Sequence, residues 1–256
     1  MRTNGLLILA FDHVFLGLLK GMEGIEHTIA DVLPSHPDGL ILNFGVLRRV
    51  RPILRDAGVT PILRLDGNRT YLAGDWTKSA EWEMFYTADS AAKAGAEAAI
   101  VNLLVGGPSE LSSIKVVASA AAACQDVGIP LVVSAIALDS ASSAGRRQRH
   151  KKLEACFVAR LAYELGADIV NAYEVADPNI VRSIKEACPI PMIVSGISAQ
   201  DDRKDPANWV AAVVGNGAAG ICVGRAVWQS AEPLKAAQNL RSAMDALTVD
   251  PSSGAL

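Results

Sequence analysis

The stretch "GADIVNAYE" (166–174) contains, in nine residues, the parts of a repeating strand-and-helix unit. Gly166 stands where a helical pattern ends, as glycines at helix C-termini do. The apolar run after it lacks clean alternation, which is typical of a strand buried on both faces. Asn171, Tyr173 and Glu174 then place polar groups at the end of that strand. The same "GA(D/E)" turn from helix to strand occurs at 95–97.

Short apolar runs of this kind occur eight times along the chain. They cover 6–13, 39–45, 60–67, 98–107, 129–138, 167–174, 190–196 and 218–224. Helical patterns lie between most of them, most clearly at 79–95, 110–127, 152–165 and 206–216. Eight strand-helix alternations predict a single parallel (β/α)8 TIM barrel, because parallel strands need helical crossovers. A doubly wound open sheet is the alternative, although it would not so naturally stop at eight strands. We assign residues 1–247 to the barrel and 248–256 to a flexible tail.

Composition excludes several classes of protein. Half of the 256 residues are hydrophobic, 20% are charged and the formal net charge is −3, which argues against a general nucleic-acid binder. The apolar N-terminal run at 6–11 is too short to span a membrane and lacks a small-residue cleavage site. We therefore expect a cytoplasmic protein that binds neither membrane nor nucleic acid. The four cysteines are widely spaced without a CxxC pair, and we expect them to be buried apolar residues.

In a barrel of this kind the functional groups lie at the C-terminal ends of the strands. The residues expected there are mostly polar, and polar groups at the ends of apolar strands need partners or ligands. The sequence therefore predicts a ligand site. Its candidate residues are Asp12, His13, Asn43, Arg64, Asp66, Asn102, Ser134, Asn171, Tyr173, Glu174, Ser195, Gly196, Gly224 and Arg225.

The last two predicted strands end in glycine turns, "VSGIS" (194–198) and "CVGRAVWQS" (222–230). Glycines let backbone N–H groups approach an anion closely, and a following helix N-terminus favours negative charge. Ser195, Gly196, Gly224 and Arg225 are therefore candidate phosphate ligands, with Arg225 adding a charge-assisted hydrogen bond. Two ordinary strand-end turns are the alternative.

The first and third strands carry charged groups. Asp12 could act as a general base or orient another group, or form a hydrogen-bonded rim pair. His13 should point away from the face that Asp12 uses, because side chains alternate along a strand. In "LRLDGNRT" (63–70), Arg64 and Asp66 share one face and could bind substrate or form an internal ion pair. Arg69 follows them.

No resident cofactor is expected. Asp12, Asp66 and Glu174 could hold Mg²⁺ with water ligands, although no spacing motif supports such a site. The basic run "GRRQRHKK" (145–152) is interpreted as a solvated loop before a helix. It could instead hold a second phosphate of a bisphosphate ligand.

At these residues the chain resembles the archaeal-type class I fructose-bisphosphate aldolases and their relatives in the deoxyribose-phosphate aldolase superfamily. The resemblance extends over roughly residues 5–245 and rests on "FDH" (11–13), "FGVLRRVRP" (44–52), "GADIVNAY" (166–173), "IVSGIS" (193–198) and "GAAGICVGRAVWQSAEP" (217–233). It implies a barrel, a phosphorylated sugar-like ligand and a homo-oligomer. It also implies that Asp12 is the acid of the first strand and that Gly196, Gly224 and Arg225 form a phosphate cradle.

The chain departs from that family at the position that matters most for its chemistry. Asn171 stands where the resemblance places the imine-forming lysine, and an amide cannot condense with a ketone. Ser134 and Ile136 stand at the end of the fifth strand, where family members often carry an aromatic residue.

Three hypotheses follow from this departure. In the first, Asn171 and Asn102 stabilise an enolate by hydrogen bonds, with or without a metal, while Asp12 or Glu174 moves protons. His13 is a further catalytic candidate, and an isomerase belongs to the same chemical group. In the second, a loop lysine forms the imine, with Lys20, Lys151 and Lys152 as candidates. In the third, the protein binds a phosphosugar without catalysis. Proton-transfer groups at the rim favour the first.

Overall fold

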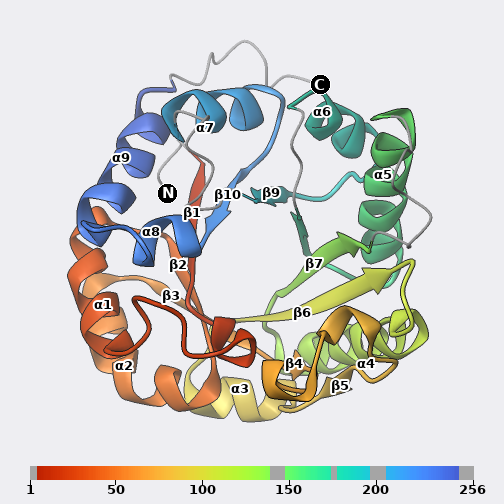
Figure 1. The fold of residues 1–256 in the computed structure, drawn as a ribbon, viewed down its shortest axis with the longest axis horizontal. Coiled ribbons are helices and arrows are strands. Elements are labelled where there is room, and N and C mark those ends of the chain that lie inside the picture. The colour runs from red at the N-terminus through yellow and green to blue at the C-terminus, as the bar shows by residue number, and fades with distance from the viewer. Residues whose placement is uncertain (1–4, 139–147, 174–177, 197–205, 248–256) are drawn as a thin grey trace.

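The structure is a computed structural model that describes residues 5–138, 148–173, 178–196 and 206–247. Its main sheet is a closed barrel of parallel strands in the order β1-β10-β9-β8-β7-β6-β3-β2 (Figure 1). These strands are β1 Leu6–Ala10, β2 Gly39–Leu42, β3 Thr60–Arg64, β6 Ala98–Val105, β7 Leu131–Ala137, β8 Ile169–Ala172, β9 Met192–Ser195 and β10 Gly220–Val223. The predicted (β/α)8 barrel is confirmed, and the open sheet is excluded because β10 pairs with β1.

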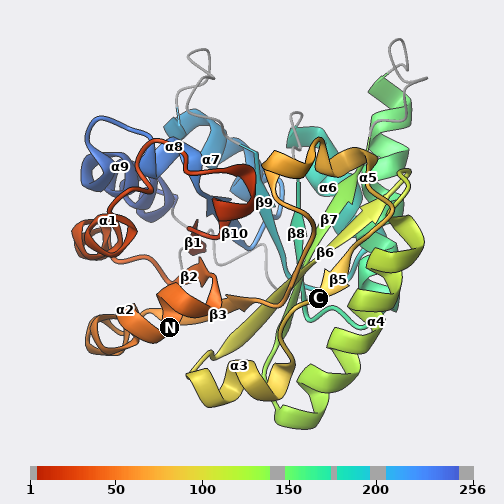
Figure 2. The ribbon, with the colours of Figure 1, turned by 60° about the horizontal axis from the view of Figure 1, so that its bottom comes forward.

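Helices form a ring around the barrel and cover the outer face of the sheet (Figures 1 and 2). They are α1 Ile25–Val32, α2 Phe44–Ala57, α3 Ala88–Ala94, α4 Glu110–Val127, α5 Gln148–Glu164, α6 Pro178–Ala187, α7 Pro206–Gly215, α8 Arg225–Trp228 and α9 Pro233–Asp245. Gly95 and Gly166 follow helices with φ of 89° and 102°, a left-handed conformation that favours glycine. This confirms their predicted role in ending helices.

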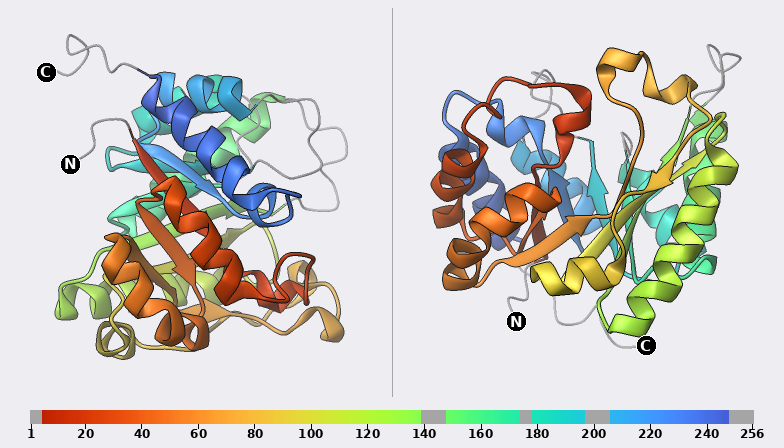
Figure 3. Two further views of the ribbon diagram at one scale, coloured as in Figure 1. Left: turned by 90° about the vertical axis from the view of Figure 1, so that its left-hand side faces the viewer. Right: turned by 90° about the horizontal axis from the view of Figure 1, so that it is seen from below.

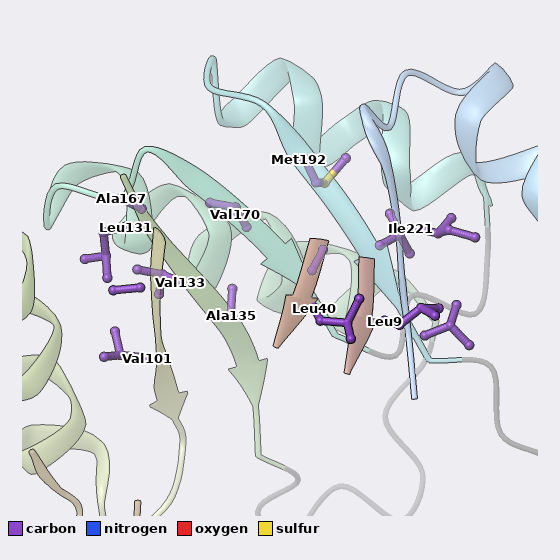
Figure 4. Close-up of a cluster of buried hydrophobic side chains, with 14 of the residues drawn as sticks. Leu9, Leu40, Val101, Leu131, Val133, Ala135, Ala167, Val170, Met192 and Ile221 are labelled. Atoms are coloured by element: carbon purple, nitrogen blue, oxygen red, sulfur yellow. The ribbon is translucent and has the colours of Figure 1, made fainter. Parts of the chain in front are cut away.

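Both faces of the barrel strands are buried. Along each strand, alternate residues point outward to the helices or inward to the barrel interior. Outward-facing residues such as Leu9, Val133 and Ile221 belong to the large core between sheet and helices (Figure 4). The other set forms a separate cluster that fills the barrel itself, as TIM barrel interiors are filled. This inner cluster consists of Ile8, Ala10, Ile41, Ile62, Ala98, Ile100, Val132, Ile193 and Cys222. The unbroken apolar runs of the sequence therefore encode two cores, not one.

The helix predicted at 79–95 is wrong over its first half. Only Ala88–Ala94 is helical, and it begins after Thr87, whose Oγ1 accepts a hydrogen bond from Ser90 N at 3.1 Å. The preceding residues form β5 Glu83–Met84, which pairs antiparallel with β4 Asp66–Gly67. Between them lie the 3-10 turns η3 Tyr71–Ala73 and η4 Trp76–Lys78.

Residues 65–87 thus form a long connection, here called the mouth segment, at one end of the barrel. Figure 3 shows its two turns (orange) at the same end as the segment that follows β1 (red). The two segments touch, because the rings of Phe15 and Phe85 lie 5.6 Å apart. This contact places aromatic side chains around the C-terminal ends of the strands.

The basic run at 145–152 was predicted to be a loop, and this is wrong for its described part. Its residues 148–152 belong to α5, so Lys151 and Lys152 are helical, while 145–147 and the tail 248–256 lie outside the described residues. Cys124, Cys188 and Cys222 are buried as expected, Cys156 is half-buried, and all four are free thiols. Within the described ranges, no helix has the length and apolarity needed to cross a bilayer.

Candidate active site

A cavity of about 210 Å³ opens at the C-terminal ends of the barrel strands. Every candidate site residue predicted from the sequence lines it except two. Asn43 instead precedes α2, and Glu174 lies outside the described residues. The lining thus includes Asp12, His13, Arg64, Asp66, Asn102, Ser134, Asn171, Tyr173, Ser195, Gly196, Gly224 and Arg225. Strand ends far apart in the sequence therefore supply one site.

The polar floor of the cavity continues the inward face of the strands. Asn102, Ser134 and Asn171 are paired in register on the adjacent strands β6, β7 and β8. Asn102 and Ser134 each follow an inner-core residue, Ile100 and Val132, by two positions, so they point the same way. The inside of the barrel is thus apolar in its middle and polar at the C-terminal ends of these strands. The change occurs between one inward-facing residue and the next, two positions along the strand.

Arg64, at the end of β3, is the centre of a charged network on this floor. Its Nε donates to Asp12 Oδ2 at 2.8 Å, and its Nη1 donates to Asp66 Oδ1 at 3.1 Å and to Asn102 Oδ1 at 2.8 Å. The expected Arg64–Asp66 ion pair is confirmed, and Asp12 joins it from β1. Burial opposes the charge on Arg64, but the two carboxylates outweigh it and raise the pKa of the guanidinium.

Asp66 is the most enclosed member of this network, with an exposed fraction of 1%. Its Oδ2 accepts hydrogen bonds from Trp82 Nε1 at 2.7 Å and from the backbone N–H of Asn102 at 2.6 Å. Burial raises the pKa of Asp66 against the opposing effect of Arg64 and these donors. Because its oxygens already accept from three groups of the protein, Asp66 positions the floor and the mouth segment.

Asp12 and His13 lie on the same side of the cavity, so the predicted opposition of their side chains is wrong. Strand β1 ends at Ala10, and His13 begins the 3-10 turn η1 His13–Leu16, where strand alternation does not apply. His13 Nδ1 lies 3.4 Å from Asp12 Oδ1 but forms no hydrogen bond. Burial lowers the pKa of His13, opposed by Asp12 and assisted by Arg225. Burial would raise the pKa of Asp12, but Arg64 outweighs it and lowers that pKa.

Three buried polar atoms that face this region lack partners among the described residues. Asn171 donates through Nδ2 to Ser134 Oγ at 3.1 Å, yet its Oδ1 has no hydrogen bond. Ser195 Oγ and His13 Nδ1 are likewise unpaired. Buried polar groups are normally satisfied, so unpaired atoms around a cavity indicate a ligand or ordered water that completes them.

The glycine turns after β9 and β10 lie on another side of the cavity. Gly196 has φ 125°, a conformation that favours glycine. Gly224 has a φ of −119°, which other residues also adopt. Glycine is needed at this position because neighbouring atoms leave no room for a side chain. A Cβ at 224 would lie 2.8 Å from His13 Cε1 and 2.9 Å from the Ala10 carbonyl oxygen. Gly224 therefore makes room for the His13 ring, which packs edge-on to Trp228 at 5.4 Å.

Sequence reasoning missed the apolar part of the wall. Phe15, Leu16, Trp76 and Trp82 line the cavity, together with Asn68 and Arg69 of the mouth segment. The incorrect helix at 79–95 concealed the tryptophans. A signal was available, because Thr87 and Asp89 are typical of a helix N-terminus and would have started the helix later.

The described carboxylates do not form a metal site. Asp12 and Asp66 are each paired with the Arg64 cation, and no group of three or more His, Cys, Asp or Glu ligands occurs in the part of the chain that the structure describes. Glu174, the third expected Mg²⁺ ligand, lies outside that part. A nearby guanidinium disfavours a second cation, so we derive no step through a metal.

The described residues that line the cavity include no lysine. Lys20 is exposed on the segment after β1, and Lys152 is exposed on α5. Lys204 lies in the sequence between β9 and α7, outside the described residues. The floor is thus built of guanidinium, amide and hydroxyl groups.

The barrel and its polar cavity define the class of protein, a TIM barrel with a small-molecule site at the strand ends. The chain belongs to the DeoC/LacD family of aldolases, because the sequence model of that family matches residues 6–230.

The chain is similar in sequence to several named enzymes and in structure to solved aldolases. The chain is 29% identical over 229 residues to 2-amino-3,7-dideoxy-D-threo-hept-6-ulosonate synthase of Halobacterium salinarum, covering 89% of this chain and 82% of that protein. It is 30% identical over 235 residues to 3-hydroxy-5-phosphonooxypentane-2,4-dione thiolase of Salmonella typhimurium, covering 91% and 75%. Among solved structures, an archaeal fructose 1,6-bisphosphate aldolase matches with a TM-score of 0.78 and 26% identity over 95% of this chain and 94% of that one. A Schiff base-forming fructose-1,6-bisphosphate aldolase matches with a TM-score of 0.79 and 25% identity over 94% of each.

Proposed function

We propose that this protein is an aldolase-type carbon–carbon lyase for a phosphorylated hydroxyketone, and that hydrogen bonds stabilise its enolate in place of a lysine imine. The cavity floor carries this proposal. It offers Arg64, Asn102, Ser134 and Asn171 to a ligand, and no lysine lies among its described residues. Preorganised donors in an enclosed site can stabilise an oxyanion strongly.

The proton-transfer role falls to His13, with Asp12 beside it. A general base must hold a proton acceptor near the reacting group and be unprotonated at the working pH. Burial lowers the pKa of His13 below its ordinary 6.5, which favours the neutral ring at pH 7. Its Nδ1 is buried beside Asp12, so Nε2 is the nitrogen left to accept a proton. The Asp12 carboxylate is held by Arg64, which lowers its pKa and makes it the weaker base. Asp12 therefore acts on His13 through its charge, which favours the protonated imidazole during proton transfer.

A phosphate would lie at the turns after β9 and β10. That side of the cavity is bordered by Ser195, Gly196, Gly224 and Arg225. Relatives support a phosphorylated ligand, because the Salmonella typhimurium thiolase and the archaeal aldolases are named for phosphorylated compounds.

The second candidate is imine chemistry with a lysine from outside the described cavity lining. It is favoured by the similarity to a Schiff base-forming aldolase. Lys204 is one lysine to consider, because it lies in the sequence between β9 and α7, and the end of β9 borders the cavity.

Enolisation can be tested without knowing the aldehyde partner. The protein is mixed with dihydroxyacetone phosphate in D₂O, and loss of the carbon-bound proton signals is followed by NMR, with and without EDTA. We expect catalysed exchange that EDTA does not remove. It should fall sharply in His13→Gln and persist in His27→Gln, a matched change of an exposed histidine on α1. Tight binding of the ketone without exchange would overturn the proposal in favour of a non-catalytic binder.

A further inference from the structure

We propose that Arg64 is the electrophile of this site and donates a hydrogen bond from Nη2 to the substrate carbonyl oxygen. In this role it stabilises the negative charge of the enolate, which an iminium neutralises in imine-forming aldolases. The inference rests on the proposed function and assigns its central role to one residue. It starts from the guanidinium contacts, which use only two of the three nitrogens. Nη2 makes no hydrogen bond to the described residues and is not fully buried, while Arg64 lines the cavity.

The free end of Arg64 is held in place by its other contacts. Oxygens of Asp12, Asp66 and Asn102 fix Nε and Nη1 at 2.8–3.1 Å. Asp66 is itself fixed by Trp82 and by the Asn102 backbone. Because a guanidinium is planar and rigid, fixing two of its nitrogens also fixes the direction in which the third nitrogen donates. The side chain is 12% exposed, so an oxyanion would meet this donor in a site with little competing water.

Arg64 also decides which way Asn102 faces. A guanidinium only donates hydrogen bonds, so the atom of Asn102 at 2.8 Å from Nη1 must be its carbonyl oxygen. The Asn102 amide nitrogen then has no hydrogen bond among the described residues, and Asn102 lines the cavity. Arg64 and Asn102 therefore present a charged and a neutral donor side by side.

The other candidate donors fit this role less well. Asn171 already donates to Ser134, and it is neutral. Arg225 follows the β10 glycine turn, where the phosphate is proposed to lie. Hydrogen bonds from an ionised donor are about twice as strong as neutral ones. Asp12 and Asp66 offset part of the charge of Arg64, but their contacts use Nε and Nη1 and leave Nη2 free to donate to a ligand.

The cleavage step balances without an added reagent. The base takes the proton of the hydroxyl on the β carbon, and that oxygen becomes the carbonyl of the released aldehyde. The bond between the α and β carbons breaks, and its electron pair forms the enolate double bond. The carbonyl π pair moves to the oxygen held by Arg64 and Asn102. Return of the proton to the α carbon restores the ketone.

The test compares an enolate mimic with the ketone. Phosphoglycolohydroxamate carries an anionic oxygen where the enolate oxygen would lie, and dihydroxyacetone phosphate carries a neutral carbonyl. Dissociation constants for both are measured by calorimetry on wild type, Arg64→Gln and Arg55→Gln, the last being an exposed arginine of α2. We expect Arg64→Gln to lose roughly 100-fold in affinity for the mimic and less than about 5-fold for the ketone. Arg55→Gln should lose neither.

A second variant guards against a folding defect. Arg64→Ala should regain deuterium exchange when guanidinium is supplied at millimolar concentration, which a merely structural arginine would not allow. Equal loss of both ligands in Arg64→Gln, or no rescue of a folded Arg64→Ala, overturns the role of Arg64. If wild type itself neither prefers the mimic nor exchanges protons, the proposed function fails and this inference fails with it.

Discussion

Arg64 Nε lies 2.8 Å from Asp12 Oδ2, so a guanidinium from β3 and a carboxylate from β1 meet although 52 residues separate them in the chain. The contact makes Asp12 a poor general base, because the cation stabilises its ionised form. It also fixes the position of Arg64 on the cavity floor. This ion pair thus supports the proposed proton-transfer role of His13 and the proposed electrophilic role of Arg64.

Removal of Asp66 should destabilise the protein strongly. Asp66→Ala leaves Trp82 Nε1, the Asn102 backbone N–H and Arg64 Nη1 without their shared acceptor. Breaking a buried ion pair on one side costs about 3–5 kcal/mol. Urea unfolding should show this loss, whereas Asp89→Ala, which removes an exposed pair with Lys93, should cost under about 1 kcal/mol. Similar losses for the two variants would contradict the network described here.

His13 should titrate below its ordinary pKa of 6.5. Because the folded pKa is lower than the unfolded one, the unfolded state binds the proton first as the pH falls. His13 therefore contributes stability above pH 6.5 that is lost as the pH drops through its folded pKa. Asp12→Asn should lower the His13 pKa further, since Asp12 favours the imidazolium. Imidazole NMR titration, assigned with His13→Gln, checks both directions, and a midpoint above 6.5 would refute them.

Gly224→Ala should reduce both activity and stability, because the new Cβ would also lie 2.9 Å from the Ala10 carbonyl oxygen. The added methyl would press on His13 Cε1 at 2.8 Å and displace the ring. Misplacing a reacting group by about 1 Å can cost on the order of 100-fold in rate. Gly45→Ala on α2 is the matched control, because its Cβ meets nothing within 4 Å and should stabilise the helix by roughly 0.5–1 kcal/mol. An unchanged rate of deuterium exchange in Gly224→Ala would show that the position of the His13 ring is not critical.

The fold and most of the cavity lining follow from the sequence, for a physical reason. Parallel strands buried on both faces are encoded by short apolar runs, and their ends must lie at one rim. Naming the residues after each run therefore identified Arg64, Asn102, Ser134 and Asn171 together. The Arg64–Asp66 pair also follows from the strand period of two.

What the sequence could not provide depends on where strands stop and on contacts between distant segments. His13 faces Asp12 because β1 ends at Ala10, and no local pattern marks that residue as the end. The Asp12–Arg64 contact depends on barrel closure. The mouth segment was missed because the apolar and aromatic residues at 79–87 imitate a helix, while their burial comes from contacts such as Trp82 with Asp66.

Asn171→Lys should introduce imine chemistry at the position where the family resemblance places a lysine. The position is buried beside Ser134 at the cavity floor, and an amine in such a place has a lowered pKa and is more nucleophilic. We expect the variant to form a borohydride-reducible adduct with dihydroxyacetone phosphate. Peptide mapping should place the adduct at residue 171, with the exposed Lys93 and Lys235 as unlabelled internal controls. Absence of labelling in a folded variant would mean that this position does not present an amine to the ketone.

Reductive trapping of the wild-type protein tests the central claim most directly. The protein is incubated with dihydroxyacetone phosphate, reduced with borohydride, and its intact mass is compared with that of Asn171→Lys treated in parallel. Our account predicts an unchanged mass for wild type beside a labelled variant, with deuterium exchange by wild type surviving the reduction. A specific reduced adduct on wild type, at Lys204 or any other lysine, would show that an imine forms and would contradict enolate stabilisation by hydrogen bonds alone.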